Sequence, residues 1–232
     1  MPGKLYLVPA PLGDAVWPIA DETKQTILRL RCFAVENAKT ARRHLKRLDS
    51  SIHLRTFRFN LLADATLDEA LQALLAGEDV GLMSEAGCPG VADPGAKLVA
   101  LAHKNGIRVV PLAGPCAILL ALMASGMNGQ RFAFRGYLPI EKASRLTRIA
   151  ELEKESMLRD ETQIFIETPY RNEAMLQSLL ATLAPQTRLC LASDLTLETE
   201  TIRTDTIADW RRHSTLLGKR PTIFLINATG ES

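Results

Sequence analysis

Apolar and polar positions alternate along the chain with two different periods. Short apolar or alternating runs are typical of strands, and longer segments in which apolar residues recur every three or four positions are typical of helices. We predict strands at 4–8, 32–36, 52–59, 80–84, 107–112, 132–138, 163–168, 189–193, 199–204 and 221–227, and helices at 22–31, 40–48, 67–75, 96–104, 116–124, 145–158 and 173–183. This order predicts an α/β fold in which helices connect the strands of a sheet.

The second half of the chain differs in character from the first. Residues 116–124 are nearly all apolar and follow the turn at Gly114-Pro115, so we predict a buried helix there. The sequence contains no internal repeat and no long Gly/Ser linker between the halves. We therefore expect two α/β lobes that meet near residues 113–117, and the interface between such lobes is the default place for a ligand.

Composition narrows the class of protein. Apolar residues make up 47% and charged residues 23% of the chain, as in an ordinary folded protein. The four cysteines form no CxxC pair and the four histidines have no metal-ligand spacing, so we predict no metal site and expect the histidines on the surface. The chain starts without a secretion signal, and its most apolar stretch, residues 112–127, is shorter than a membrane span. Free thiols and a cytoplasmic location are the expectation.

The distribution of basic residues says more about partners than the net charge does. The formal net charge is only +2, whereas the segment from Lys39 to Arg58 carries its basic residues opposed only by Asp49. Such a segment is either a solvated helix face or a surface that binds RNA phosphates. The candidate RNA-binding residues are Lys39, Arg42, Arg43, Lys46 and Arg47.

Three segments rich in glycine and proline follow predicted strands, at residues 9–13, 84–95 and 111–117. The carboxyl ends of parallel strands are where α/β proteins bind ligands, and glycine lets the main chain approach a ligand closely. Each segment also has a purely structural interpretation as a connection between a strand and a helix. In the second segment, Asp93 is a candidate cap for the helix predicted to begin at residue 96.

Five segments, taken in order and spacing, resemble one family. They read LYLVPAPLG at 5–13, SEAGCPGVADPG at 84–95, PLAGPCA at 111–117, FAFRGYLP at 132–139 and FIETPYR at 165–171. On these segments the chain resembles the ribosomal RNA small subunit methyltransferase I family over nearly its whole length. The resemblance is specific, because all five segments agree in register.

The resemblance implies a two-lobed tetrapyrrole-methylase fold that assembles as a homodimer. A parallel-sheet lobe would span residues 1–114 and a mixed-sheet lobe residues 115–232, with S-adenosylmethionine in the cleft between them. The turn at 9–13 would also face the acceptor. The residues that the resemblance assigns to the cofactor are Pro9, Pro11, Ser84, Glu85, Ala86, Gly87, Val91, Ala92, Asp93, Pro115, Cys116, Ala117, Thr168 and Pro169.

The chain departs from the family pattern on the acceptor side. Glu36-Asn37-Ala38-Lys39 stands where family members carry Glu-Asp-Thr-Arg, and Pro169-Tyr170-Arg171 stands where they carry Pro-His-Arg. Lysine keeps the positive charge of arginine but not its planar fork of donors. The catalytic residues therefore stay undetermined, with Glu36, Lys39 and Arg171 as the candidates.

The function that these features favour is methyl transfer from S-adenosylmethionine to RNA, such as ribose 2'-O-methylation of small-subunit ribosomal RNA. The cofactor carries the chemistry, so the protein has to align the acceptor and exclude water. A methylase of a tetrapyrrole or other small molecule is one alternative, although the first turn lacks the Gly-x-Gly-x-Gly of such enzymes. A cofactor-binding protein without transferase activity is another, because the acceptor-side residues are altered.

Overall fold

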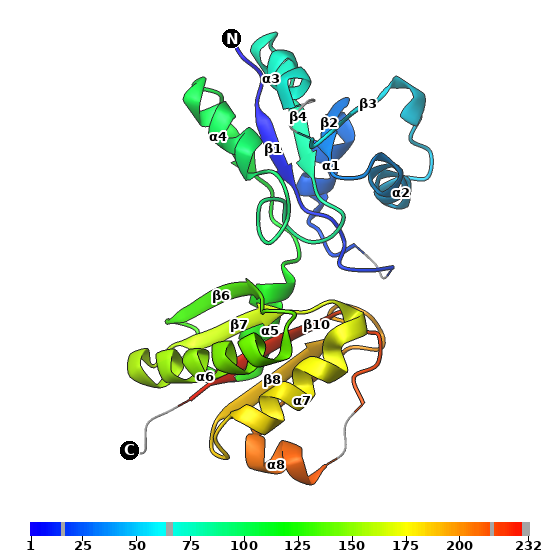
Figure 1. Cartoon of the computed structure of the whole chain (residues 1–232). Coiled ribbons are helices and arrows are strands. Elements are labelled where there is room, and N and C mark those ends of the chain that lie inside the picture. Colours follow the sequence, from blue (N-terminus) through cyan, green and yellow to red (C-terminus); the bar gives the residue numbers. More distant parts are fainter. Residues whose placement is uncertain (15–16, 64–66, 214–215, 229–232) are drawn as a thin grey trace. The chain divides into compact units, whose positions relative to one another are not determined.

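The chain folds into two units, each built on a five-stranded sheet (Figure 1). The computed structural model describes residues 1–14, 17–63, 67–213 and 216–228. Unit 1 is Met1–Cys116 and unit 2 is Ala117–Ser232, so the chain passes from one unit to the other once. Each unit has its own sheet and its own hydrophobic core.

Unit 1 contains a fully parallel sheet. Its strands are β1 (Leu5–Val8), β2 (Cys32–Val35), β3 (Arg58–Leu61), β4 (Val80–Met83) and β5 (Val109–Pro111). They lie in the order β3-β2-β4-β1-β5, and the neighbouring strands run parallel. The carboxyl ends of parallel strands lie along one edge, so the segments that follow β1, β2, β4 and β5 leave the sheet on the same side.

Helices cover both faces of this sheet. The helices are α1 (Asp21–Arg29), α2 (Ala38–Leu48), α3 (Leu67–Leu75) and α4 (Ala96–Lys104). The first two pack on one face around Phe33, and the other two pack on the opposite face around Leu82. This burial on both faces explains why β2 and β4 are continuous apolar runs rather than alternating ones.

α2 begins two residues earlier than predicted because of its cap. The side-chain oxygen of Asn37 accepts hydrogen bonds from the main-chain N–H groups of Lys39 at 2.9 Å and Thr40 at 3.3 Å. Such a cap satisfies donors that the first helical turn leaves free. The basic helix is therefore anchored directly behind β2.

The strand predicted at 52–59 is wrong in its first half. Residues Leu54–Thr56 form a short 3-10 helix (η1), and β3 begins only at Arg58. The partner strand β2 starts at Cys32, which pairs with Arg58, so it offers no pairing to earlier residues. The alternation that suggested a strand reflects Phe57 and Phe59, whose rings stack on that of Phe33 with centroids 6.0 and 5.9 Å away.

Unit 2 contains a mixed sheet. Its strands are β6 (Phe132–Tyr137), β7 (Thr162–Ile166), β8 (Arg188–Ser193), β9 (Thr201–Thr206) and β10 (Thr222–Asn227). They lie in the order β6-β7-β10-β8-β9, in which only the β6–β7 pair among the described strands is parallel. The predicted α/β fold, with a parallel sheet first and a mixed sheet second, is confirmed.

The core of unit 2 lies between its sheet and three helices. The helical elements are α5 (Ala117–Ser125), α6 (Lys142–Arg159), η2 (Pro169–Arg171), α7 (Asn172–Thr182) and α8 (Ile207–Arg212). Side chains of α6, α7 and α8 bury the stacked rings of Phe165 and Phe224, whose centroids are 5.6 Å apart. Among the helices in the described ranges, none has the length and apolar character needed to cross a membrane.

Full burial of the apolar helix α5 is contradicted by the structure. Ile118, Ala121 and Leu122 are buried, whereas Leu119 is 48% and Met123 80% exposed. One face of α5 packs on β8, β9 and β10, and a single helix face cannot bury residues all round. The opposite face of α5 therefore presents apolar side chains at its surface.

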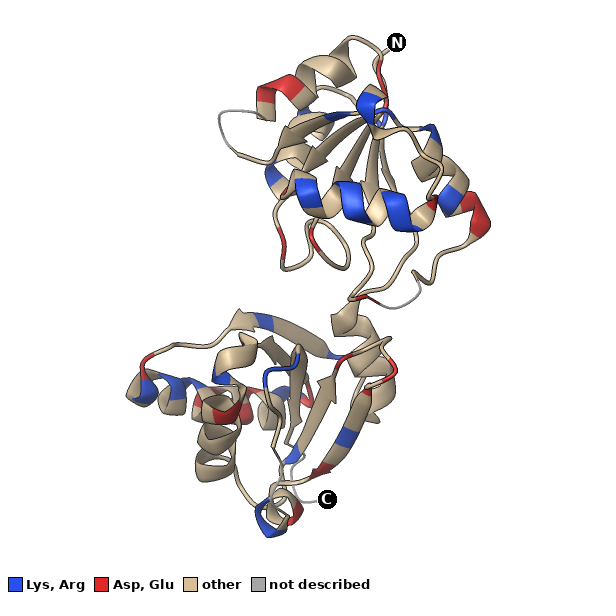
Figure 2. Ribbon diagram, turned by 90° about the vertical axis from the view of Figure 1, so that its right-hand side faces the viewer, with Lys and Arg blue, Asp and Glu red and all other residues tan. Residues whose placement is uncertain are grey.

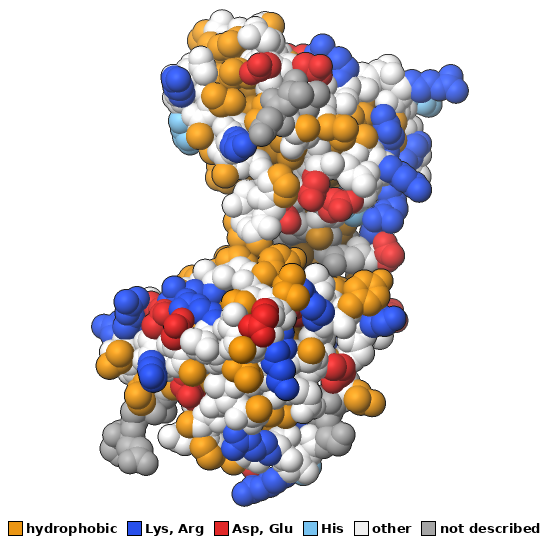
Figure 3. All heavy atoms as spheres, viewed as in Figure 1, with side chains coloured by type: hydrophobic (Ala, Val, Ile, Leu, Met, Phe, Trp, Pro, Cys, Tyr) orange, Lys and Arg blue, Asp and Glu red, His pale blue; other side chains and the backbone are white. Residues whose placement is uncertain are grey.

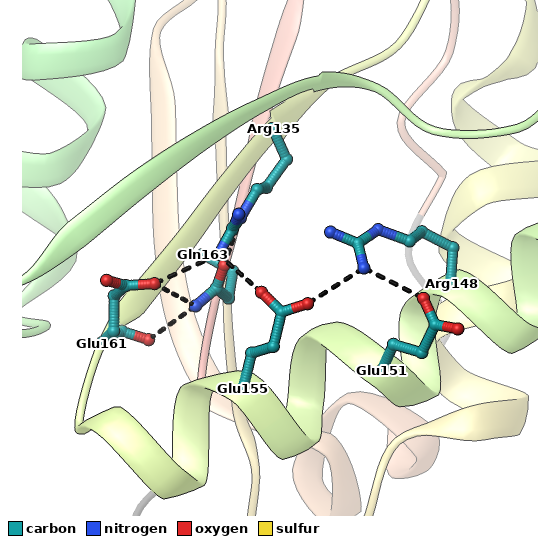
Figure 4. A network of polar contacts seen from close by, with 6 residues as sticks. All are labelled: Arg135, Arg148, Glu151, Glu155, Glu161 and Gln163. Carbon is teal, nitrogen blue, oxygen red and sulfur yellow. Dashed lines mark hydrogen bonds and ion pairs between the residues drawn. The ribbon is translucent and has the colours of Figure 1, made fainter.

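A polar network joins β6 to α6 and β7 (Figure 4). The guanidinium of Arg135 donates to Gln163 at 2.7 Å, to Glu155 at 2.6 Å and to Glu161 at 3.2 Å. The second carboxylate oxygen of Glu155 accepts from Arg148 at 3.0 Å. Because β6 has only one neighbouring strand in the described sheet, this network is a second attachment for that edge. Arg135 of the FAFRGYLP segment thus has a structural role.

Candidate functional site

The segments that follow β1 and β4 are joined by main-chain hydrogen bonds. The N–H of Ala10 donates to the carbonyl of Gly87 at 2.7 Å, and the N–H of Gly87 donates to the carbonyl of Ala10 at 3.1 Å. β1 and β4 are neighbours in the sheet, so their carboxyl ends bring these segments together. We call residues 84–95 the β4 loop.

The segment after β5 meets the same edge from the other side of β1. A Cβ atom added to Gly114 would lie 2.3 Å from both Cβ and Cγ of Pro9, which only glycine avoids. The thiol of Cys88 lies 3.5 Å from the carbonyl oxygen of Pro115, within reach of a weak hydrogen bond. Three segments that are far apart in the sequence therefore form one continuous surface of unit 1.

The β4 loop has a sharply turned backbone. Gly87, Gly90 and Gly95 have φ angles of +70°, +80° and +133°, and Ala92 has a φ of +63°. Glycine adopts such angles without strain, whereas the side chain of Ala92 makes its angle cost on the order of 1 kcal/mol, and strained residues of this kind cluster at ligand sites. The strained residue is thus Ala92, at an exposed position of the loop.

Asp93 does not cap α4, contrary to the sequence-based expectation. The N-cap position is Gly95, which has no side chain to accept the hydrogen bond. Burial raises the pKa of the Asp93 carboxyl, a hydrogen bond with Ser84 works against this, and the carboxylates of Glu36 and Glu85 add to the rise. Asp93 is therefore part of an acidic group at the carboxyl edge of the sheet.

This acidic group places negative charge at the β4 loop. Within the described ranges, no three or more His, Cys, Asp or Glu side chains are grouped so that they could hold a metal. The electrostatic field of Glu36, Glu85 and Asp93 nevertheless attracts positive charge to the loop. This negative charge is compatible with a positively charged ligand.

The predicted cofactor residues of unit 1 fall into two groups. Pro9, Pro11, Ser84 and Gly87 are buried and support the loops from inside, with Pro115. The second group is exposed and consists of Glu85, Ala86, Val91 and Ala92. Asp93 is half-buried and lines a cavity of about 290 Å³ together with Leu62, Leu67 and the start of α4. A ligand that reaches the β4 loop would touch the second group.

The remaining predicted residues belong to unit 2 or to the end of unit 1. Cys116 is the last residue of unit 1, and Ala117 is the first of α5. Thr168 and Pro169 follow β7, and the N–H of Thr168 donates to the carboxylate of Glu167 at 2.6 Å. The third catalytic candidate, Arg171, donates to the same carboxylate at 2.9 and 2.5 Å.

The basic residues of α2 form one exposed face. Lys39, Arg42, Arg43, Lys46 and Arg47 are all exposed, whereas Ala41, Leu45 and Leu48 are buried. Figure 2 shows lysine and arginine repeating along this helix, and Figure 3 shows them lining the edge of unit 1 on which Figure 1 places α2. We call these five residues the basic face. The guanidinium of Arg42 also lies 4.7 Å from the ring centre of Phe59.

The expectation that the histidines lie on the surface is wrong for His44. His44 is 2% exposed and its Nε2 lies 2.9 Å from the carbonyl oxygen of Glu85 in the β4 loop. Thr40, one turn earlier, donates its hydroxyl to the Glu85 carboxylate at 2.9 Å. Sequence reasoning missed both residues. Local sequence gave no signal for them, because Glu85 lies 45 residues beyond Thr40 and 41 beyond His44.

Comparison with characterised proteins places these features in a family context. Residues 4–210 match the family of tetrapyrrole (corrin/porphyrin) methylases. The ribosomal RNA small subunit methyltransferase I of Vibrio cholerae is 35% identical over 202 residues, which cover 86% of this chain and 67% of that protein. The protein of the same name from Escherichia coli O157:H7 is 35% identical over 208 residues, with 86% and 68% covered.

Solved structures share the fold at much lower identity. The methyltransferase CobJ aligns with a TM-score of 0.62 and 18% identity, covering 97% of this chain and 94% of its own. Uroporphyrin-III C-methyltransferase from Thermus thermophilus, in a complex with S-adenosylhomocysteine, aligns with a TM-score of 0.54 and 14% identity, covering 97% of both chains. At these identities the likeness concerns the fold alone.

Proposed function

The chain belongs to the tetrapyrrole methylase family, and from this premise we propose that it transfers a methyl group from S-adenosylmethionine to RNA of the small ribosomal subunit. It is a methyltransferase, as its relatives of 35% identity are. The observation that carries the proposal is the meeting of three glycine- and proline-rich segments at one edge of the parallel sheet. We infer the RNA substrate from the relatives, which are ribosomal RNA small subunit methyltransferases.

The surface of unit 1 fits S-adenosylmethionine. The exposed Glu85, Ala86, Val91 and Ala92 and the main chain of the β4 loop would hold it. The acidic group of Glu36, Glu85 and Asp93 suits its positive charge. When bound, it supplies an electrophilic methyl group. The assignment of Thr168, Pro169 and Ala117 to the same cofactor remains a prediction.

The residues of this chain would then position the acceptor and accept its proton. Orientation of reacting groups can contribute on the order of 7–11 kcal/mol to lowering a barrier, so fixed loops matter more here than a strong base. Of the three catalytic candidates, Glu36 lies at the β4 loop, with its Oε2 accepting the Glu85 N–H at 3.3 Å. We propose Glu36 as the group that accepts the proton of a hydroxyl acceptor, while Lys39 belongs to the basic face.

The methyl acceptor can be identified directly. The purified protein is incubated with radiolabelled S-adenosylmethionine and, in separate reactions, small ribosomal subunits from a strain that lacks the gene, deproteinised ribosomal RNA, and a porphyrinogen. We expect label in the ribosomal RNA and none in the porphyrinogen. Label in the porphyrinogen alone would support a small-molecule methylase instead. Tight binding of S-adenosylhomocysteine without transfer to any of these acceptors would contradict an enzymatic function.

Charge reversal on the basic face should weaken RNA binding. The double variant Arg42→Glu and Arg43→Glu is expected to lose about one to two phosphate contacts with a ribosomal RNA fragment. Each contact contributes about 0.7–0.9 to the slope of log affinity against log salt concentration, so this slope should become shallower by that amount per contact. The measurement is RNA affinity at several salt concentrations. Lys142→Glu with Lys154→Glu, on α6 of unit 2, is the matched control. An equal loss of RNA affinity in the control variant, or no loss in either variant, would show that the basic face does not bind the RNA.

Two further features belong to this proposal. We propose a cytoplasmic enzyme, because ribosomal RNA is found there. We also propose a homodimer, as the resemblance implies, and the apolar residues Leu119 and Met123 exposed on α5 are the candidate contact between subunits.

A further inference from the structure

One residue, Glu85, ties the β4 loop to α2. Its main-chain N–H donates to Oε2 of Glu36 at 3.3 Å, its carboxylate accepts from Oγ1 of Thr40 at 2.9 Å, and its carbonyl lies 2.9 Å from Nε2 of His44. Thr40 and His44 are four residues apart on α2 and therefore share one side of the helix, and Glu36 stands just before the N-cap residue Asn37. We call these four residues the Glu85 clamp. It contacts the main-chain N–H, the carbonyl and one carboxylate oxygen of Glu85.

The buried ring of His44 is set up for one protonation state. A carbonyl oxygen can only accept, so Nε2 carries the hydrogen and, in the neutral ring, Nδ1 is an acceptor. Nδ1 is buried without a hydrogen-bond partner among the described residues. The indole of Trp17 stands edge-on to the imidazole, with ring centroids 6.0 Å apart. A second proton, on Nδ1, would find no acceptor among the described residues.

The surroundings of His44 also favour the neutral ring. Burial lowers the pKa of His44 from its usual value of 6.5, and the hydrogen bond to the Glu85 carbonyl works in the opposite direction. The charged groups around it are Arg43 and Arg47, which lower its pKa further, Asp14, which raises it, and the carboxylates of Glu36 and Glu85 in the clamp. His44 is therefore neutral at pH 7.

We propose that His44 is a positioning residue that orients the peptide between Glu85 and Ala86 for cofactor binding, an inference that rests on the proposed methyltransferase function. In a trans peptide the carbonyl and the N–H point in opposite directions. With the Glu85 carbonyl turned toward His44, the N–H of Ala86 points away from α2, and Ala86 is exposed. This N–H is a donor for a carboxylate or hydroxyl oxygen of the bound molecule.

Two substitutions separate positioning from packing. His44→Leu keeps an apolar side chain but removes the donor, so the Glu85 carbonyl is left unpaired, and the affinity for S-adenosylhomocysteine should fall about tenfold. His44→Gln retains an N–H donor at similar reach, so its affinity should stay within about threefold of the parent. Titration calorimetry at pH 7.5 measures both. Equal losses in the two variants would indicate packing alone and would overturn the proposal.

The pH profile is a second, independent readout. When the β4 loop is in the clamp, the pKa of His44 is lowered. When the loop has moved away, His44 takes up a proton near its ordinary pKa, so protonation favours the released loop. Lowering the pH through 6.5 therefore favours the released loop, and the parent's affinity should be constant above this value and fall below it. His44→Gln should lose this fall. His53→Gln, at an exposed histidine outside the clamp, should keep it.

Hydrogen exchange of the amides in residues 84–92, without any ligand, tests the clamp separately from the cofactor. His44→Leu should speed exchange there about tenfold, because the loop opens more often, while His44→Gln and His53→Gln should leave it unchanged. If the parent fails to bind S-adenosylhomocysteine, the proposed function fails even where exchange responds as expected. Unchanged exchange in His44→Leu overturns the role of His44 whether or not the cofactor binds.

Discussion

Replacing Gly114 by alanine is expected to lower the affinity for S-adenosylhomocysteine about a hundredfold, the effect of losing about two hydrogen bonds to the ligand. The new Cβ atom would lie 2.3 Å from two carbon atoms of the Pro9 ring. A proline ring cannot rotate away as a long side chain can, so the segments after β1 and β5 must separate. The measurement is titration calorimetry of S-adenosylhomocysteine with the parent and the variant.

A matched substitution separates this local clash from a general effect of alanine. Gly129 has no atom within 4 Å of an added Cβ and no positive φ, so Gly129→Ala should bind as the parent does. Thermal unfolding of both variants shows whether Gly114→Ala remains folded. A folded Gly114→Ala protein with the parent's affinity would show that the contact between Pro9 and Gly114 does not shape the cofactor site.

Replacing Arg171 by leucine should destabilise unit 2 by about 3 kcal/mol, because removing one partner leaves a buried charge uncompensated. The Glu167 side chain is 1% exposed, and Arg171 donates to it through two nitrogens at 2.9 and 2.5 Å. After the substitution, the carboxylate would retain its bond from the Thr168 N–H. The strain falls on the residues that follow β7, which include the predicted cofactor residues Thr168 and Pro169.

The two tryptophans allow this loss to be measured in one unit. Trp210 is buried in the core of unit 2, where its indole N–H donates to the carbonyl of Leu189 at 2.9 Å. In a Trp17→Phe background, fluorescence during urea unfolding therefore reports on unit 2. Arg212→Leu breaks the exposed pair with Asp209 and should cost less than about 1 kcal/mol. A loss of similar size in both variants would contradict the burial argument for Arg171.

The carboxyl-edge loops could be predicted from the sequence because their signals are local. Glycine and proline after a buried apolar run mark a turn at the end of a strand, and a parallel sheet then brings such turns to one edge. This is why residues 9–13, 84–95 and 111–117, chosen from local sequence, meet in unit 1. The basic face was equally visible, because α2 carries its charges at helical spacing.

Other parts of the site depend on which strands are neighbours, which local sequence does not reveal. His44 meets Glu85, 41 residues further along the chain, only because β2 lies beside β4. A histidine in a basic helix gives no local sign of this partner. The six-residue helix α8 is too short for a helical period to stand out, and the start of β3 depended on where β2 begins.

The chain crosses from unit 1 to unit 2 once, between Cys116 and Ala117, and this affects how the protein can be engineered. Every described strand of each sheet comes from one uninterrupted stretch of sequence, so a break in the polypeptide at this point removes no strand from either sheet. The architecture is therefore suited to recombination, in which one half is exchanged for that of a relative while the hydrogen-bonded sheets stay whole.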